Sequence, residues 1–502
     1  MLFIGILILI LVIGLMPEKL PWSFFNRKAA LMLFFSAILS FNSFETFHSG
    51  IAIYNGLWHI TLMNISIATF IYIIGGLTLL LGEGPLSLIN GSYSRGNLFK
   101  PEYSLIIMLS TMGMISLIHS YDLITLFLAI ELQSLSLYVL ATIYKESESA
   151  TSAGLKYFLL GGLSSSFILL GSSLLYGLTG TTNFESLYII SNFEYDSSIL
   201  ITSLIPALLI LLVGLLFKIA AAPFHNWAPD VYDGVPTLVT SWLAVLPKIS
   251  ILILMIEIYI NIFYQFNSIF TILIISSFLS LLLGSILGLS QYRIKRILAF
   301  STISHVGFLL LALGTNTYQS IESFIFYIIQ YSLTSLTIFY ILIAFGYILP
   351  AKISSNRWSI LTLSQLKGKL IYNTLLAWSF AICLFSMAGI PPCIGFFGKF
   401  LILLSAINAP MGLNFMVLIA ILTSVISTVY YLKIIKIIHF DSSEGNNSLS
   451  LSPIIQNNIS SQNIVFSNAL VISIFSLIII LFILNPTSFI NLIHIISLTQ
   501  IS

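Results

Sequence analysis

Long hydrophobic stretches recur along the whole chain and are separated by short polar segments. A helix needs about 20 apolar residues to cross a hydrocarbon layer roughly 30 Å thick. The pattern therefore predicts an all-α polytopic membrane protein with about 14 transmembrane helices. The predicted spans are residues 1–16, 29–45, 61–82, 103–120, 122–144, 153–178, 199–222, 235–260, 268–289, 297–314, 320–346, 372–390, 411–437 and 466–485.

Basic residues fall in alternate loops of this pattern. Sixteen of the nineteen Lys and Arg residues belong to odd-numbered loops: Lys19, Arg27, Lys28, Arg95, Lys100, Lys145, Lys156, Arg293, Lys295, Arg296, Lys352, Arg357, Lys367, Lys369, Lys433 and Lys436. The even-numbered loops hold acidic residues instead, namely Glu185, Glu194, Asp196 and Glu322. The positive-inside rule places the odd-numbered loops on the cytoplasmic or matrix side and both termini on the opposite side.

The composition agrees with a membrane protein and narrows its chemistry. Hydrophobic residues make up 58% of the chain and charged residues 7%, whereas soluble domains carry about 25% charged residues. The net charge of +2 gives no electrostatic sign of a nucleic-acid partner. Two cysteines, Cys383 and Cys393, cannot ligate an iron–sulfur cluster, and both lie in one hydrophobic segment, so we expect no structural disulfide. No nucleotide-binding glycine motif is present, so we expect no cofactor on this chain.

Four charged residues lie within the predicted spans or beside their breaks: Glu131, Lys218 and Lys248 lie within spans, and Lys399 follows the second break. A charge at the centre of a bilayer costs about 2.5–3.5 kcal/mol on insertion scales, so such residues usually face the interior of the helix bundle. Each lysine could reach the interface or form a structural ion pair. Four such residues together favour proton translocation.

Four other polar residues have simpler or open interpretations. Glu257 lies near the end of its span and is predicted to reach the interface, and Asp122 is predicted to cap the fifth span. His305 and His225 are either hydrogen-bonded packing residues or members of a proton relay, because imidazole titrates near neutral pH.

Prolines break two of the predicted helices, at Pro223 and at Pro391-Pro392. A proline removes a backbone hydrogen bond, and irregular backbone is tolerated in a membrane only where it lines protein or water. Each break has a lysine beside it. If spans 4–8 and 9–13 are two units, the broken helix is the fourth in each, and the odd number of crossings inverts the second unit.

This organisation predicts four segments. Residues 1–100 hold three N-terminal helices, 101–261 the first repeat, 262–440 the second, inverted repeat, and 441–502 a polar loop, a final helix and a tail. Within them we expect protons to pass from Glu131 and Lys218 to Lys248, with His305 or water, and then to Lys399. A carboxylate beside a buried lysine favours the charged amine, and separation of the two favours release of its proton.

Several motifs around these residues resemble the chain 2 family of antiporter-like subunits in proton-pumping NADH:ubiquinone oxidoreductase, respiratory complex I. They are AIELQSLSLYVLA, GLKYFLLGGLSSS, FKIAAAPFHNWAPDVYDG, LPKISILI, KRILAFSTISHVGFLLLALG and AGIPPCIGFFGKF. The resemblance runs from about Tyr103 to Lys436. The three preceding helices resemble the long form of bacteria, plants and fungi. Cys393 departs from the small or apolar residue frequent there.

The resemblance implies proton translocation, with Glu131, Lys218, Lys248 and Lys399 on the key positions of the family. It implies that NAD, FMN, iron–sulfur clusters and ubiquinone belong to partner subunits, so that this subunit of an NADH:ubiquinone reductase has no redox centre. Expected partners are a sister antiporter-like subunit, small membrane subunits and lipids. The expected location is the mitochondrial inner membrane, with the odd-numbered loops in the matrix and both termini on the intermembrane-space side.

Two other functions stay open. A stand-alone cation/proton antiporter subunit of the multi-subunit sodium/proton type would share the broken helices and exchange ions without redox partners. A non-pumping scaffold would have no use for isolated lysines within spans. The match through ELQSLSLYVLA and GLKYFLLG favours the complex I family over the antiporter.

Overall fold

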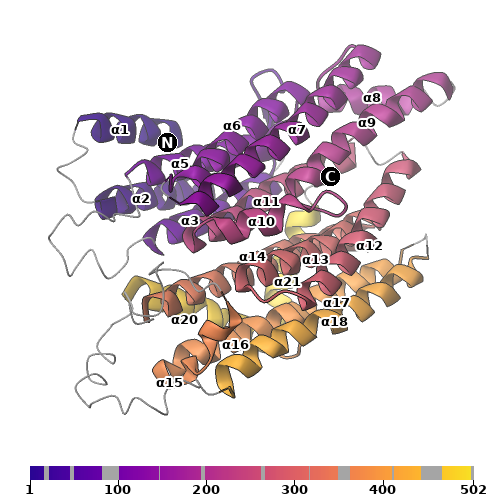
Figure 1. The fold of residues 1–502 in the computed structure, drawn as a ribbon. Helices are drawn as coiled ribbons and strands as arrows, with labels where there is room; N and C mark the ends of the chain where they lie inside the picture. The colour runs from indigo at the N-terminus through magenta and orange to yellow at the C-terminus, as the bar shows by residue number, and fades with distance from the viewer. Residues whose placement is uncertain are drawn as a thin grey trace, which may run out of the picture.

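The computed structural model describes residues 1–15, 22–45, 50–81, 101–145, 147–193, 198–261, 266–315, 317–348, 362–409, 412–441 and 466–498. Helices lie side by side in one bundle (Figure 1), with the N-terminal helices along one flank and the orange helices α16–α18 along the other. The described part of the chain is all-α except for one small antiparallel hairpin.

The first part of the chain forms the N-terminal flank. Its elements are α1 (Leu2–Leu15), α2 (Trp22–Asn42), the 3-10 helix η1 (Ser43–Glu45), β1 (Ile51–Ile53), β2 (Trp58–Ile60) and α3 (Leu62–Leu81). The hairpin pairs Ile51 with Ile60 and Ile53 with Trp58.

The predicted first repeat contains α5 (Glu102–Ile118), α6 (Leu123–Thr142), α7 (Glu148–Thr179), α8 (Phe184–Phe193), α9 (Ser198–Lys218), α10 (Trp227–Gly234) and α11 (Thr237–Asn261). The predicted second repeat contains α12 (Asn267–Leu289), α13 (Ile294–Gly314), α14 (Tyr318–Ile348), η3 (Leu363–Leu366), α15 (Lys369–Tyr372), α16 (Thr374–Ala388), α17 (Ile394–Ile407) and α18 (Asn414–His439). The chain continues with α20 (Phe466–Leu481), η4 (Phe482–Leu484) and α21 (Pro486–Leu498).

The helix lengths support a polytopic membrane protein. Nine helices of the described part are long and apolar enough to cross a membrane. A tenth candidate is the pair of segments Asn468–Leu484 and Pro486–Leu498, which bend by 96°. The helices α1, α5, α9, α16 and α17 are apolar but shorter. Each of the 14 predicted spans overlaps a helix, but the number of crossings and the inversion of the repeat stay predictions.

The core of the bundle lies around α11, α13 and α14. The apolar window of α13 is 100% buried, whereas that of α7 is 28% buried. A helix that is apolar all round and completely enclosed belongs to the interior of a membrane bundle, while the open sides of α7 suit lipid or a partner subunit. Polar groups on α13 are therefore shielded from lipid.

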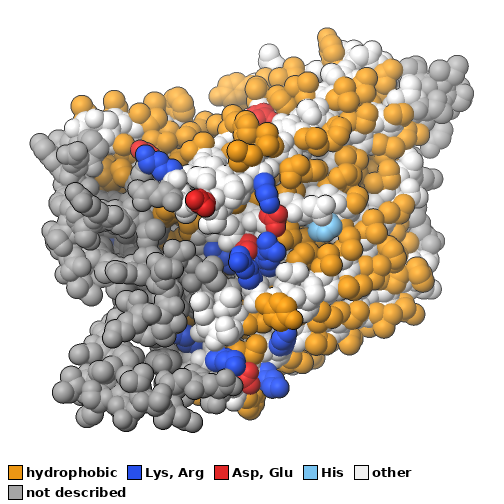
Figure 2. All heavy atoms as spheres, viewed as in Figure 1, with side chains coloured by type: hydrophobic (Ala, Val, Ile, Leu, Met, Phe, Trp, Pro, Cys, Tyr) orange, Lys and Arg blue, Asp and Glu red, His pale blue; other side chains and the backbone are white. Residues whose placement is uncertain are grey.

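Basic residues gather near one end of the helices on the face shown in Figure 2, and hydrophobic side chains cover most of the remainder. Several residues predicted in loops lie inside helices instead: Arg27, Lys28, Lys156, Lys295, Arg296, Lys369, Lys433 and Lys436. The helices extend beyond their apolar stretches because their backbone hydrogen bonds continue and long basic side chains tolerate the interface. Lys19, Arg95, Lys100, Glu194, Asp196, Lys352 and Arg357 lie outside the described residues.

The structure confirms one of the two simpler predictions for polar residues and corrects the other. Asp122 caps α6, since its Oδ1 accepts a hydrogen bond from the Ile124 amide at 2.8 Å. Glu257 does not reach the interface: it is buried, and its carboxylate accepts a hydrogen bond from Asn64 of α3. The N-terminal helices cover this end of α11, which apolar periodicity along one span cannot reveal. Cys383 and Cys393 are free thiols.

Candidate functional site

The first break begins where α9 ends, at Lys218. The next residues leave the helix: Ala220 has a positive φ of 60°, and the Ala222–Pro223 peptide bond is cis. The chain then enters α10 at Trp227, whose indole Nε1 donates a hydrogen bond to the Phe217 carbonyl at 3.0 Å. The Ala220 amide donates to the same carbonyl at 3.1 Å, so the indole is a second donor at this helix end.

Lys218 points to Tyr138 of α6. Its Nζ donates a hydrogen bond to the Tyr138 hydroxyl at 3.3 Å and lies 5.7 Å from the centre of the ring. Tyr138 packs edge-on against Tyr157, which stacks on Trp227. These aromatic contacts hold the lysine at the break.

Glu131 lies two helical turns before Tyr138 on α6. Within the described residues its Oε1 is buried and has no hydrogen-bond partner, and no ion pair within 4 Å joins it to Lys218. The two charges nevertheless interact electrostatically. Tyr138 is therefore the direct partner of Lys218, with the buried carboxylate nearby.

Lys248 lies in the enclosed centre of the bundle. Its Nζ donates a hydrogen bond to Thr302 of α13 at 3.1 Å, and it lies 5.7 Å from the centre of the Tyr232 ring. Gln133 of α6 donates to the carbonyl of Pro247 at 3.3 Å, so a polar contact from the helix of Glu131 adjoins this lysine.

His305 follows Thr302 by three residues and lies on the same face of α13. Its Nδ1 shares a hydrogen bond with the Tyr327 hydroxyl at 2.6 Å, and its Nε2 lies 3.4 Å from the Tyr431 hydroxyl. Both lysines of the central region, Lys248 and Lys399, interact electrostatically with the ring. A phenol at each nitrogen suits a side chain that accepts a proton on one side and releases one on the other.

Lys399 belongs to α17, after the second break, but its side chain returns to the helix before it. Its Nζ donates a hydrogen bond at 2.8 Å to the carbonyl of Ala388, the last residue of α16. Phe308 lies below the ammonium, 5.5 Å away, one turn after His305. The α13 face formed by Thr302, His305 and Phe308 thus extends from Lys248 to Lys399.

His225 lies within the first break and is buried. Its Nδ1 is buried and has no hydrogen-bond partner among the described residues. Among the described residues no hydrogen bond or ring contact joins His225 to Lys218, so the structure does not bring it into the Lys218–Tyr138 contact.

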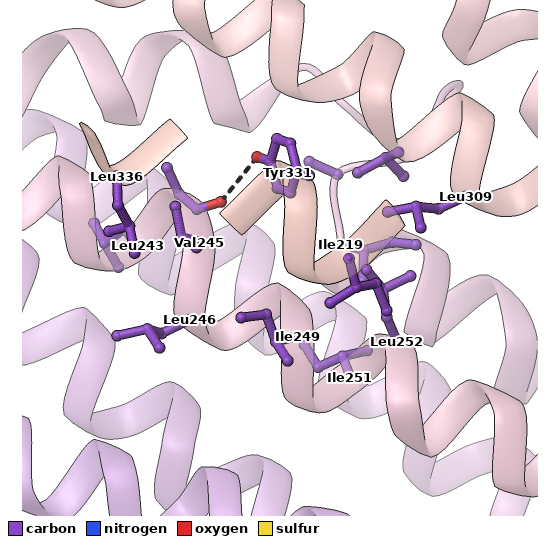
Figure 3. Close-up of a cluster of buried hydrophobic side chains, with 14 of the residues drawn as sticks. Ile219, Leu243, Val245, Leu246, Ile249, Ile251, Leu252, Leu309, Tyr331 and Leu336 are labelled. Atoms are coloured by element: carbon purple, nitrogen blue, oxygen red, sulfur yellow. Dashed lines mark hydrogen bonds between the residues drawn. The ribbon is translucent and has the colours of Figure 1, made fainter. Parts of the chain in front are cut away.

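The direct hydrogen bonds form separate groups around Lys218, Lys248, His305 and Lys399. Figure 3 shows the apolar cluster beside them, where Ile219 lies with Ile249, Leu252 and Leu309. In the same cluster the Tyr331 hydroxyl of α14 donates to the Ala244 carbonyl of α11 at 3.3 Å. The side chains alone therefore do not form one continuous chain of hydrogen bonds from Lys218 to Lys399.

The sequence analysis missed a network of ion pairs beside the first break. Asp233 of α10 accepts from Arg293 at 2.6 Å and from Arg296 at 3.1 Å. Asp230 pairs with Arg296 at 3.2 Å and with Lys156 of α7 at 2.8 Å. The network joins α10 to α13. Both aspartates stand in the motif FHNWAPDVYDG, but nothing in the sequence shows which arginines they meet.

Residues 120–427 match a family of transmembrane proteins described as NADH:quinone oxidoreductase/Mrp antiporter. All six candidate site residues lie within this match. The chain belongs to this family.

The chain is also similar to two relatives over two thirds of its length or more. The chain is 50% identical to NADH-ubiquinone oxidoreductase chain 2 of Rhizopus oryzae, with 99% of each chain covered. It is 37% identical to NADH-quinone oxidoreductase subunit N of Rhodospirillum rubrum over 69% of each chain.

Two solved structures resemble this fold. A chain of respiratory complex I from Thermus thermophilus has a TM-score of 0.70 at 26% identity, covering 95% of this chain and 96% of that chain. A chain of the Mrp complex from Dietzia sp. has a TM-score of 0.81 at 18% identity, covering 100% and 96%. At that identity the second likeness concerns the fold alone.

Proposed function

We propose that this chain is a proton-translocating core subunit in the membrane arm of respiratory complex I, the chain 2 position. One observation supports this most strongly: the half-buried Lys218 and the buried Lys248 and Lys399 lie at two helix breaks and between them. The half-buried Glu131 interacts electrostatically with Lys218, and the chain is 50% identical to a chain 2 over 99% of its length. Isolated charges in a membrane are costly and therefore indicate function.

In this proposal Glu131 and Lys218 exchange a proton through Tyr138, Lys248 passes it by way of Thr302 and His305, and Lys399 completes the route. Water completes the path between these separate hydrogen-bonded groups. His225 is a further relay in the first break. Spans 4–8 and 9–13 act as two inverted units, each with one broken helix, within about 14 crossings.

The remaining features follow from the same assignment. NAD, FMN, iron–sulfur clusters and ubiquinone bind to partner subunits, among them a sister antiporter-like subunit beside small membrane subunits and lipids. The chain lies in the mitochondrial inner membrane, with the basic odd-numbered loops in the matrix and both termini on the intermembrane-space side.

The test is Lys218→Met in the assembled complex reconstituted in liposomes. We expect coupled proton pumping to be lost, because methionine fills a similar volume but carries no proton. The matched control is Lys433→Met on α18, an exposed lysine beside Tyr292, which should pump normally. Undiminished pumping by an assembled Lys218→Met complex would contradict the proposal.

The matching family also includes the Mrp antiporter, which supports a second candidate, a stand-alone cation/proton antiporter subunit. That function predicts sodium-dependent proton exchange in a small complex without NADH oxidation. Purification from native membranes separates the two functions, since the first requires co-migration with NADH-oxidising activity in a large assembly.

A further inference from the structure

A second buried carboxylate, Glu257, lies outside the route just described. It follows Lys248 by nine residues on α11, which is about 14 Å along a helix axis. Its residue is 3% exposed, although it lies close to the end of the helix. A buried acid in a membrane helix requires an explanation, because ionised groups are costly to remove from water.

Asn64 of α3 binds this carboxylate directly. Its Nδ2 donates a hydrogen bond at 2.6 Å to Glu257 Oε1 and lies 3.3 Å from the carbonyl of His59. Asn64 is itself completely buried, and its backbone amide donates to the Thr61 hydroxyl at the start of α3. The amide can donate to an oxygen of the acid whether or not that acid carries a proton.

Two histidines continue from Asn64 toward the surface. The His59 amide donates to the His119 carbonyl at 2.9 Å, and the His59 ring lies 4.8 Å from the ring of Tyr121. The Nδ1 of His119 is buried and has no hydrogen-bond partner within the described residues. The hairpin is held here because the Tyr121 amide donates to the Leu57 carbonyl at 3.0 Å.

An exposed acid, Glu185, lies on the outer side of this group. Glu185, in the first turn of α8, acts electrostatically on both His59 and Tyr121, and the charge of Glu257 also acts on Tyr121. Glu185 is exposed, His59 is half-buried and Glu257 is buried. In the predicted topology each member lies in or next to an even-numbered loop, on the side opposite the basic loops.

The two histidines can pass a proton as neutral imidazoles. Burial lowers the pKa of His59, although the charge of Glu185 opposes this shift. Neutral imidazole accepts a proton on one nitrogen and holds a hydrogen on the other. Burial raises the pKa of Tyr121 to about 12, so this phenol keeps its proton.

We propose that Glu257, Asn64, His59 and His119 form a further proton-binding site, which exchanges protons with the side of the membrane opposite the basic loops. The proposal rests on the proposed function, because it gives the pumping chain a contact with that side. It also assigns a role to the N-terminal helices: α3 supplies Asn64, and the hairpin before it supplies His59. Glu257 holds the proton, and Asn64 positions its carboxyl group.

The alternative is that Asn64 and Glu257 only attach α3 to α11. The variant Glu257→Gln separates the two roles, because a glutamine carbonyl still accepts the Asn64 hydrogen bond but cannot bind or release a proton at neutral pH. A structural role predicts a normal Gln variant and a defective Glu257→Leu variant. The proton-binding role predicts that both variants are defective.

The experiment measures protons translocated per NADH oxidised by the complete complex in liposomes, with NADH oxidation by an artificial acceptor as the assembly control. We expect Glu257→Gln to assemble and to translocate at least fivefold fewer protons, and Glu148→Gln, at an exposed acid in the first turn of α7, to change the ratio by less than twofold. Normal translocation by Glu257→Gln overturns the proposal. If that variant does not assemble, the wild-type complex is treated with an apolar carbodiimide, which labels protonated carboxyl groups. Labelling of Glu257 that falls as the pH rises supports the site, and absence of labelling at every pH overturns it.

The outcome is distinguishable from failure of the proposed function. If Lys218→Met abolishes pumping and Glu257→Gln leaves it normal, only the Glu257 site is wrong. If Lys218→Met pumps normally, the proposed function is itself wrong.

Discussion

At both helix breaks, backbone carbonyls at a helix end need hydrogen-bond donors. Different groups supply these donors at the two breaks. Each half-helix, α9 and α16, ends inside the bundle and leaves carbonyls without backbone partners. At the end of α9 the Ala220 amide and the Trp227 indole both donate to the Phe217 carbonyl, and Lys218 donates to Tyr138 instead. At the end of α16 Lys399 itself donates to the Ala388 carbonyl.

This difference shows that a lysine beside a break has no single role. The negative end of a helix attracts a cation in both places, but only Lys399 satisfies a backbone acceptor. Lys218 is bound to a side chain that adjoins a carboxylate, so its environment can change when a side chain rotates. We infer that the first break is the more adjustable and that the second holds its lysine more rigidly.

The largest expected effect tests whether Lys399 carries a proton or only neutralises the end of α16. Lys399→Arg keeps a positive charge and a donor for the Ala388 carbonyl, but arginine is not deprotonated in proteins. We expect an assembled complex whose proton pumping is lost. Pumping at the wild-type rate would assign Lys399 a purely structural function.

The second prediction concerns the ion pairs that connect the first break to α13. Asp233 has 6% of its side chain exposed and meets two arginines, whereas the side chain of Asp230 is 40% exposed. Because both arginines are partly exposed, we expect Asp233→Asn to destabilise the chain by about 2 kcal/mol. Asp230→Asn should cost at most about 1 kcal/mol. Thermal unfolding of the purified complex measures both, and equal shifts would show that burial does not set the strength of this network.

The third prediction compares two residues, one at each break, whose backbone has a positive φ. Gly389 has a φ of +85°, and a Cβ at this position would lie 2.8 Å from Cδ of Lys399. A left-handed conformation costs other residues about 1–2 kcal/mol, so Gly389→Ala should displace the lysine and reduce the pumping rate about tenfold.

The matched variant at the first break is Ala220→Gly, since Ala220 already has a φ of 60°. Glycine adopts this conformation freely, so we expect normal pumping and a gain in stability of up to about 1 kcal/mol. A large loss of pumping in this variant would mean that the alanine methyl group, rather than the backbone conformation, matters.

A smaller loss of pumping is expected for the indole at the end of α9. Trp227→Phe keeps an aromatic ring against Tyr157 but removes one of the two donors to the Phe217 carbonyl, since the Ala220 amide remains. One lost hydrogen bond costs about 1 kcal/mol, so pumping should fall about fivefold. Unchanged pumping would show that the hydrogen bond of the indole does not support Lys218.

Much of this architecture was predictable from local patterns. The apolar periodicity located a helix under every predicted span, and the cost of burying charge singled out Glu131, Lys218, Lys248 and Lys399. The separate helices α10 and α17 were not predicted, because a proline marks the end of a helix but not how far the chain remains helical afterwards.

The side-chain contacts between different helices of the bundle could not be predicted in the same way. Tyr138, Thr302, Tyr327 and Tyr431 are common residues of apolar helices, and their contacts join positions far apart in the chain. Glu257 shows the limit most clearly. Its position in the span predicted an interfacial acid, and only the packing of α3 against α11 revealed a buried one.

The sequence by itself determined that this chain is a helical membrane protein, where its helices are broken and which charged residues lie within the apolar spans. These properties depend on composition and spacing along one segment, and the hydrocarbon layer acts on each segment separately. Only the tertiary structure decided which group neutralises each helix end and which acids are enclosed. Such choices depend on the neighbours that packing brings within hydrogen-bond distance, and no single segment contains that information.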